Sequence, residues 1–480
     1  MDAERERRRL RRTVPPGAVV AALSLGGLTA SFMQTIIVPI QADLPELLDA
    51  ERSDTAWVVT ITLLVAAIAT PIAGRLGDMV GKRRIALVML AIMIAGSVVA
   101  AASPGLVWLI VGRGLQGAGM GVIPLGISIM RDVLPERRLG SGIALMSATL
   151  GIGGAIGLPL SAVIAEHADW HLLFWIAAAL GALCLVLILA LVPVSVLRSP
   201  GRFDWAGAIG LALGLAGCLL ALSRGSDWGW ASPATLGTGL GGLAVLLVWG
   251  WYELRDGNPL VDLRVAARAP VLLTNLASVC LGFALFAFNI GVPQVLEIPA
   301  GTGIGLGLDL LSTSLILLPS GLMMLILSPI SGRLIRAVGP KAMLIAGALV
   351  QGAAYAVCLV GIPSLWAALV ASIVTGVGIG IAYAAMPTLI MRAVPVTESA
   401  AANGLNTLMR SLGTTIASAV VGAVLAGMTT QLGGVAVPDA AAFRVTFLLG
   451  LLASLGSALV AAFIPRGGQR RAGEHEALPD

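Results

Sequence analysis

The sequence predicts an all-α polytopic membrane protein with 14 transmembrane helices. Of its 480 residues, 58% are hydrophobic and only 11% are charged, and the mean hydropathy is +0.96. Soluble domains carry about 25% charged residues. The apolar residues form long continuous runs that do not alternate with polar residues, and this favours membrane-spanning helices over a barrel.

Fourteen apolar runs follow one another along the chain, each close to the length of about 20 residues that a bilayer-spanning helix needs. The predicted spans are residues 18–40, 55–74, 84–103, 106–130, 139–165, 171–193, 205–223, 233–252, 270–296, 308–331, 340–361, 364–386, 402–427 and 442–464. Because this number is even, both termini are expected on the same side of the membrane.

The basic residues indicate which side that is. Of the 30 lysines and arginines, 25 fall in the tails and in the connections that share their side, whereas only Arg52 and Arg224 lie in connections on the other side. Cationic residues next to spans stay in the cytoplasm, so we expect both termini to be cytoplasmic and the protein to lie in the cell membrane, surrounded by lipid. The arginines are spread along these connections, and this argues against a nucleic-acid partner.

The segment Gly74–Arg84, GRLGDMVGKRR, connects the second and third predicted spans. A connection this short makes the two helices an antiparallel pair, and its glycines allow a tight turn and a close approach of helix ends. We treat six of its residues as a gating loop: Gly74, Arg75, Asp78, Gly81, Lys82 and Arg83. The acid Asp78 is expected to meet the positive N-terminus of a helix, or an arginine such as Arg131, from the same half of the chain.

The second half of the chain repeats the first. Gly332–Lys341, GRLIRAVGPK, has the glycine spacing of Gly74–Arg84, with Arg336 at the place of the acid, and two further glycine patterns recur at nearly the same offset. Such repeats predict two related six-helix bundles, with a two-helix insert between them. The predicted domains are residues 1–16 and 466–480 as cytoplasmic tails, 17–200 and 257–465 as the two bundles, and 201–256 as the inserted hairpin.

The pattern G-x-L-x-D-x-x-G-K-R, from Gly74 to Arg83, resembles the loop between helices 2 and 3 of the major facilitator superfamily of transporters. The segments around the insert, FDWAG from Phe203 and PLVDL from Pro259, resemble the fourteen-helix branch of drug:proton antiporters within it. This resemblance implies export of small amphiphilic molecules by proton antiport and alternating access. It also implies that the gating loop stabilises the outward-open form.

Arg113 lies inside the fourth predicted span, where a charge costs roughly 2.5–3.5 kcal/mol on insertion scales. Together with Gln116 and Gly117 it forms R-x-x-Q-G, which resembles the span-4 motif whose arginine is tied to proton coupling in the same superfamily. The alternative is an arginine that extends to a membrane surface.

The fifth predicted span carries Gly151, Gly154, Gly157 and Pro159, which resemble the glycine/proline motif of antiporters. The family expects the proline directly after the last glycine, but here Leu158 intervenes. Ordinary close packing of helices is the alternative explanation for these glycines.

Acidic residues are absent from the depth of the predicted spans. The antiporter branch usually places an acid in span 1, where this chain has Met33. The nearest candidates for proton coupling are Glu297 and Asp309 at the ends of spans, although Asp309 also suits a helix cap and Glu297 a rim position. A cavity without a deep acid has less reason to prefer cations, so neutral and anionic amphiphiles are expected as substrates as much as cationic ones. Polar residues that could line the substrate cavity are Gln34, Gln116, Asn289, Gln294 and Tyr383, each of which could equally join helices by hydrogen bonds.

The sequence therefore predicts a proton-coupled exporter, expected to work as a monomer, and not an enzyme. It contains no nucleotide-binding loop, no metal-ligand cluster and no nucleophile–base arrangement, so no cofactor is expected. Two alternatives stay open. A facilitator or importer on the same fold would lack proton coupling, and a non-transporting membrane receptor would need neither Arg113 nor a repeated half.

Overall fold

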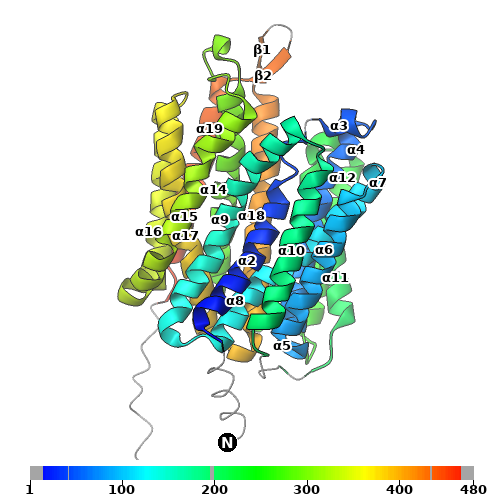
Figure 1. Cartoon of the computed structure of the whole chain (residues 1–480), viewed down its shortest axis with the longest axis vertical. Coiled ribbons are helices and arrows are strands. Elements are labelled where there is room, and N and C mark those ends of the chain that lie inside the picture. The colour runs from blue at the N-terminus through cyan, green and yellow to red at the C-terminus, as the bar shows by residue number, and fades with distance from the viewer. Residues whose placement is uncertain (1–13, 42, 195–198, 200, 433–434, 466–480) are drawn as a thin grey trace, which may run out of the picture.

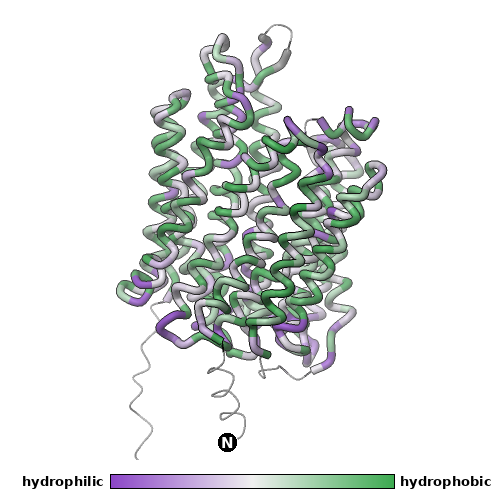
Figure 2. Tube along the Cα trace, viewed as in Figure 1, coloured by the Kyte–Doolittle hydropathy of each residue, from purple (hydrophilic) through white to green (hydrophobic). Residues whose placement is uncertain are grey.

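The computed structural model describes residues 14–41, 43–194, 199, 201–432 and 435–465. Within these ranges it contains 14 helices long and apolar enough to cross a membrane, as the sequence predicted. They form one upright bundle (Figure 1). Hydrophilic residues gather toward its two ends and hydrophobic ones along its middle (Figure 2), which is the distribution that a lipid bilayer demands. The predicted tails lie outside the described residues, apart from residues 14–16.

The first six-helix bundle is built from the first part of the chain. Its spans are α2 (Pro16–Thr35), α5 (Trp57–Val80), α6 (Lys82–Ala101), α7 with α8 (Leu106–Ala118 and Val122–Val133), α9 (Glu136–His167) and α10 (His171–Leu191). A short 3-10 turn, η1 (Gly119–Gly121), joins α7 to α8, and two further short helices, α3 (Leu44–Leu47) and α4 (Arg52–Thr55), precede α5.

The second bundle repeats this arrangement with longer helices. Its spans are α14 (Ala269–Glu297), α15 (Leu310–Val338), α16 (Pro340–Gly361), α17 (Leu365–Ala393), α18 (Ser399–Gly427) and α19 (Ala440–Ala462). The 3-10 turns η2 (Ala300–Thr302) and η3 (Val396–Glu398) lie in its connections. Between α18 and α19 the strands β1 (Thr429–Leu432) and β2 (Val435–Pro438) pair antiparallel, with Thr429 opposite Pro438.

The insert consists of α11 (Trp205–Trp228) and α12 (Pro233–Glu253), followed by the short helix α13 (Leu263–Ala266). Asp204 begins α11 by accepting a hydrogen bond from the Gly207 N–H, and Ser232 begins α12 in the same way. One apolar cluster joins Leu211 and Leu215 of α11 to Ala67 of α5 and Leu408 of α18. The insert therefore packs against helices of both bundles.

The gating loop is mostly helical, which corrects the predicted connection. Helix α5 continues to Val80 and α6 begins at Lys82, so Gly81 alone separates them. Its φ of 123° is one that residues other than glycine rarely adopt. The helix does not stop at Gly74 because the polar residues beyond it find partners inside the protein. Gly339, with φ of 87°, makes the same turn between α15 and α16.

The two bundles meet along two seams that repeat each other. In the α5–α18 seam, a Cβ on Gly74 would lie 2.5 Å from the carbonyl oxygen of Ala400. In the α9–α15 seam, a Cβ on Gly332 would lie 2.6 Å from the nitrogen of Ser141. The repeated glycines thus mark the same backbone crossing in both seams.

Candidate functional site

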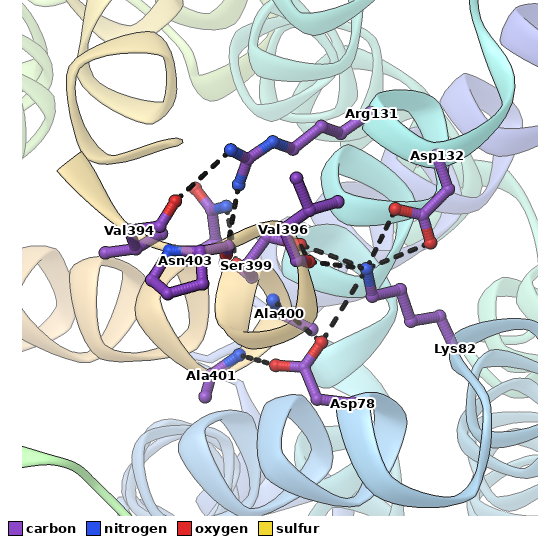
Figure 3. Close-up of polar contacts among 11 residues, drawn as sticks. Asp78, Lys82, Arg131, Asp132, Val394, Val396, Ser399, Ala400, Ala401 and Asn403 are labelled. Carbon is purple, nitrogen blue, oxygen red and sulfur yellow. Dashed lines mark hydrogen bonds and ion pairs between the residues drawn. The ribbon is translucent and has the colours of Figure 1, made fainter. Parts of the chain in front are cut away.

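Asp78 joins the two bundles at one end of the molecule, which we name the Asp78 end. It lies in the last turn of α5, and its side chain is completely buried. Its carboxylate accepts hydrogen bonds from the backbone N–H groups of Ala400, at 3.3 Å, and Ala401, at 2.8 Å, in the first turn of α18 (Figure 3). The unpaired N–H groups and the positive dipole of a helix N-terminus favour an anion there.

Lys82 completes this contact from the start of α6. Its ammonium lies 2.9 Å and 3.1 Å from the two carboxylate oxygens of Asp132 and donates to the Ser399 hydroxyl at 3.0 Å (Figure 3). It also lies 3.7 Å from Asp78. We name Asp78, Lys82, Asp132 and Ser399 the Asp78 cluster. Removing one partner of a buried, hydrogen-bonded ion pair is costly, because the other charge then stays buried without its partner.

Arg131 forms a second link across the bundles. Its guanidinium donates to the carbonyl oxygens of Met391, Val394 and Pro395, at 2.5, 3.2 and 3.4 Å. Two of these carbonyls belong to the end of α17 or follow it directly, where a cation is favoured.

The prediction that Asp78 contacts a helix N-terminus is therefore correct, whereas the prediction that this helix belongs to the same half of the chain is wrong. Asp78 does meet a helix N-terminus, but the helix is α18 of the other bundle. Arg131 binds carbonyls of the other bundle and gives Asp78 no hydrogen bond in the part of the chain described. The reason is the close backbone crossing at Gly74, which brings the start of α18 onto the last turns of α5.

The other gating-loop cations lie around this cluster. Arg83 donates to the carbonyl oxygen of Leu189 at the end of α10, at 2.6 Å. Arg75 is half-buried, and one nitrogen of its guanidinium lies near the backbone of Gly201.

Arg113 occupies a separate site in the first bundle. It is 1% exposed and therefore does not extend to a membrane surface. Its guanidinium donates to the Met33 carbonyl at 2.6 Å, to the Gln116 side-chain oxygen at 2.9 Å and to the Val58 carbonyl at 3.3 Å. Gln116 in turn donates to the Ser97 hydroxyl at 2.9 Å. Among the described residues no carboxylate forms an ion pair with Arg113.

Met33 lies directly at this site. Its carbonyl accepts from Arg113, and its buried thioether sulfur accepts from the Ser97 hydroxyl at 3.7 Å. The position at which the antiporter branch usually carries an acid is thus adjacent to the buried arginine. In this chain the hydrogen-bond acceptors around Arg113 are neutral groups.

The remaining predicted proton-coupling residues lie at helix ends. Glu297 is the last residue of α14 and is exposed. Asp309 accepts a hydrogen bond from the Ser312 N–H at 3.2 Å and so caps α15. Hydrogen bonds from Ser312 lower the pKa of the Asp309 carboxyl below its ordinary value.

The predicted cavity residues differ in their surroundings. Gln116 belongs to the Arg113 site, and Gln34 is half-buried in α2. Asn289 and Gln294 are both exposed on α14. Tyr383 is buried in α17, and the guanidinium carbon of Arg410 lies 4.9 Å from the centre of its ring.

The span-5 glycines serve two faces of α9. Gly151 faces the side chain of Met324 on α15, across the bundles. Cβ atoms on Gly154 and Gly157 would lie 3.5 Å from a Thr35 methyl and 3.3 Å from the Phe32 ring, both on α2. Pro159 lies inside α9 without ending it. These positions fit close packing, and a role in antiport stays a prediction.

Three residues of these sites were missed by the sequence reasoning. Asp132 directly follows Arg131, in a connection where only cations were considered. Ser399 precedes an apolar run and has the residue type of a helix start. Arg410 lies inside the predicted span 402–427 and has no predicted role. In each case the type of residue was informative, but its partner lay on another helix.

Comparison with known proteins places these sites in context. The pattern of the Major Facilitator Superfamily matches residues 23–418 and again 274–478. Lincomycin resistance protein LmrB of Listeria monocytogenes is 28% identical over 339 residues, which are 70% of each chain. Multidrug resistance protein Stp of Mycobacterium tuberculosis is 26% identical over 418 residues, 83% of this chain and 74% of its own. The crystal structure of the human organic anion transporter MFSD10 (TETRAN) superposes with a TM-score of 0.64 and 17% identity, over 92% of this chain and 99% of its own.

Proposed function

Because this chain belongs to the Major Facilitator Superfamily, we propose that it is a secondary transporter that exports small amphiphilic molecules, antibiotics among them. The relatives named for resistance to lincomycin and to multiple drugs support export as its direction. Members of the superfamily are multi-pass membrane transporters that bind small molecules and usually act as monomers. We extend these properties to this chain.

The observation that carries the proposal is the Asp78 cluster between the bundles. Alternating access needs contacts that form in one state and break in the other. The cluster joins α5 and α6 to the start of α18 through charge-assisted hydrogen bonds, which depend on geometry and are lost when the bundles separate. A receptor that does not transport would have no need of such a contact between two repeated bundles.

We propose that the Asp78 end faces the cytoplasm and that both termini lie there. The distribution of the 30 basic residues supports this orientation. Helix α2 begins at the end of the bundle where α5 finishes (Figure 1), so the first described residues share the side of Asp78. In this orientation the cluster closes the cytoplasmic side, which is the outward-facing form.

We further propose that inward proton movement drives export and that Arg113 takes part in the coupling. Its complete burial within the fourth span supports a functional role, since a charge inside the membrane is costly. Met33 supports the second candidate, an uncoupled facilitator, because it leaves the Arg113 site without the acid that the antiporter branch usually carries. Glu297 and Asp309 are the remaining candidates for proton binding, and both lie at helix ends.

Proton release from acidified everted vesicles distinguishes the two candidates. Candidate amphiphiles are added to vesicles that hold the wild type, Arg113→Ala or the control Arg444→Ala, which removes an exposed arginine from α19. We expect substrate-dependent proton efflux in the wild type and the control, and its loss in Arg113→Ala. Transport of labelled substrate without proton movement in the wild type would establish the facilitator instead.

A further inference from the structure

A second arginine lies at mid-depth, in the second bundle. Arg410 is about a third of the way along α18, and Tyr383 lies at a similar distance from the other end of the antiparallel helix α17. Both residues are therefore roughly 15 Å from the Asp78 end, at a helical rise of 1.5 Å per residue. Because the hydrocarbon core is about 30 Å thick, Arg410 is a charge near the middle of the membrane.

Arg410 and Tyr383 form a pair whose polar atoms have no hydrogen-bond partner in the part of the chain that the structure describes. The guanidinium carbon lies 4.9 Å from the centre of the Tyr383 ring. Tyr383 is 2% exposed, and its buried hydroxyl has no hydrogen-bond partner within the described ranges. Arg410 is half-buried, and among the described residues no hydrogen-bond acceptor or carboxylate is bound to its guanidinium.

The contrast with Arg113 shows that this lack of partners is particular to the second site. Three of the five N–H groups of Arg113 donate, to two carbonyl oxygens and to Gln116. The backbone of Arg410 is packed closely on Gly282 of α14, so α18 cannot easily shift to find its side chain another partner. A buried donor without an acceptor is costly, and a cation at this depth more so.

The chemistry of the two side chains defines the missing partner. A guanidinium has five N–H donors and no acceptor, and a phenol hydroxyl can donate as well. The groups that match them are oxygen anions such as carboxylate, sulfonate or phosphate. Tyr383 belongs to an apolar cluster with Leu281 and Met386, and Leu28 of the first bundle packs against this cluster. A ligand here would therefore combine an anionic head with an apolar body.

We propose that Arg410 and Tyr383 bind the anionic head of an amphiphilic substrate, with Tyr383 orienting the guanidinium and donating its hydroxyl. This inference rests on the proposed export function and specifies its substrate class. A cationic amphiphile is disfavoured at this subsite, because Arg410 repels it and neither residue offers a negative group.

A pair of dyes that differ in one group tests the subsite. Anilinonaphthalene sulfonate is an amphiphilic anion, and N-phenylnaphthylamine is its uncharged counterpart. Fluorescence titrations use the full-length protein in lipid nanodiscs, with empty nanodiscs as the blank. We expect Arg410→Gln to weaken binding of the sulfonate roughly tenfold to hundredfold, with binding of the uncharged dye unchanged. Arg410→Lys should keep part of the affinity, Tyr383→Phe should lose less than Arg410→Gln, and Arg444→Gln, the matched exposed control, should lose none.

Three results would overturn the inference. Arg410→Gln could leave binding of the sulfonate unchanged. It could also weaken binding of both dyes equally, which would indicate a damaged fold and not a lost anion contact. The wild type could bind the sulfonate, release it when oleate is added as a competitor, and never transport it, while it still exports the uncharged dye. That outcome would assign the subsite to a membrane fatty acid.

Dye export from cells distinguishes failure of this inference from failure of the proposed function. If the wild type exports neither dye, export is wrong, whereas the binding titrations still report on the subsite. If the wild type exports the uncharged dye and Arg410→Gln binds the sulfonate normally, export stands and the anion subsite is wrong.

Discussion

The two seams between the bundles have the same packing and different charges. Gly74 in the α5–α18 seam and Gly332 in the α9–α15 seam both lie against the backbone of the opposite helix. Four residues later the first seam has Asp78, which accepts two N–H groups from α18. The second has Arg336, which is exposed and donates to the carbonyl oxygen of Arg137 at 3.2 Å.

The two repeated segments therefore have the same helix packing but different charged residues. Lys82 follows Gly81 and is buried among partners from both bundles. In the second bundle Lys341 donates to the carbonyl oxygens of Ala462 and Ile464, at 2.7 and 2.6 Å, within its own bundle. We therefore expect only the α5–α18 seam to depend on charge when it opens and closes.

The largest expected effect is at Asp78. Asp78→Asn replaces a buried anion at the α18 N-terminus and leaves Lys82 with one carboxylate partner, so the closed form of this end should lose stability. We expect dye export to fall roughly tenfold to hundredfold and a cysteine introduced in the first turn of α18 to become more reactive. Arg336→Gln, the matched change in the other seam, should alter export by less than about twofold. Equal losses in both variants would refute the comparison.

The shared packing should respond equally in both seams. A methyl group on Gly74 or Gly332 must displace backbone atoms, so Gly74→Ala and Gly332→Ala should each lower the free energy of unfolding by about 1–3 kcal/mol. Alanine also gains up to about 1 kcal/mol in a helix. Gly237→Ala on α12, where a Cβ meets nothing within 4 Å, measures that gain. Thermal unfolding in detergent checks the result, and a large loss at only one seam would show that the packing is not equivalent.

A smaller effect is expected at Ser399, the neutral member of the Asp78 cluster. Its hydroxyl accepts from Lys82 and donates to the Val396 carbonyl, both at 3.0 Å. Ser399→Ala removes these bonds and leaves the carboxylates in place, so export should fall about twofold to tenfold. A loss as large as that of Asp78→Asn would contradict the view that charge dominates this seam.

The smallest effect is expected outside both seams, at Asp309. Hydrogen bonds from Ser312 lower the pKa of its carboxyl in the folded protein. The cap therefore stabilises the fold at pH values above 3.8, the ordinary pKa of this carboxyl. That contribution is lost as the pH falls through the folded pKa. Asp309→Asn keeps a capping side chain but cannot ionise. The unfolding temperature of the wild type relative to that of the variant should therefore fall as the pH drops through 3.8 and below, with export at neutral pH unaffected.

Much of the fold could be predicted because only helices and closed barrels can satisfy their backbone hydrogen bonds in lipid. The 14 spans follow from the length of apolar runs, and the turns at Gly81 and Gly339 follow from repeated glycines. The strands β1 and β2, and the continuation of α5 through the gating loop, were not predicted. The two strands pair with each other, whereas α5 continues because Asp78 finds its partners on α18.

The sequence by itself determined the membrane class, the repeated bundles, the insert, the presence of an arginine inside the fourth span and the missing acid at Met33. Only the tertiary structure decided what these residues touch. Asp78 and Ala401 are 323 residues apart in the chain, and Arg113 and Met33 are 80 apart. Apolar periodicity specifies that a helix is buried, but it carries no information on which helix crosses it. Partners at a crossing are determined by packing across the whole bundle, so the Asp78 cluster and the pair of Arg410 and Tyr383 became visible only in the structure.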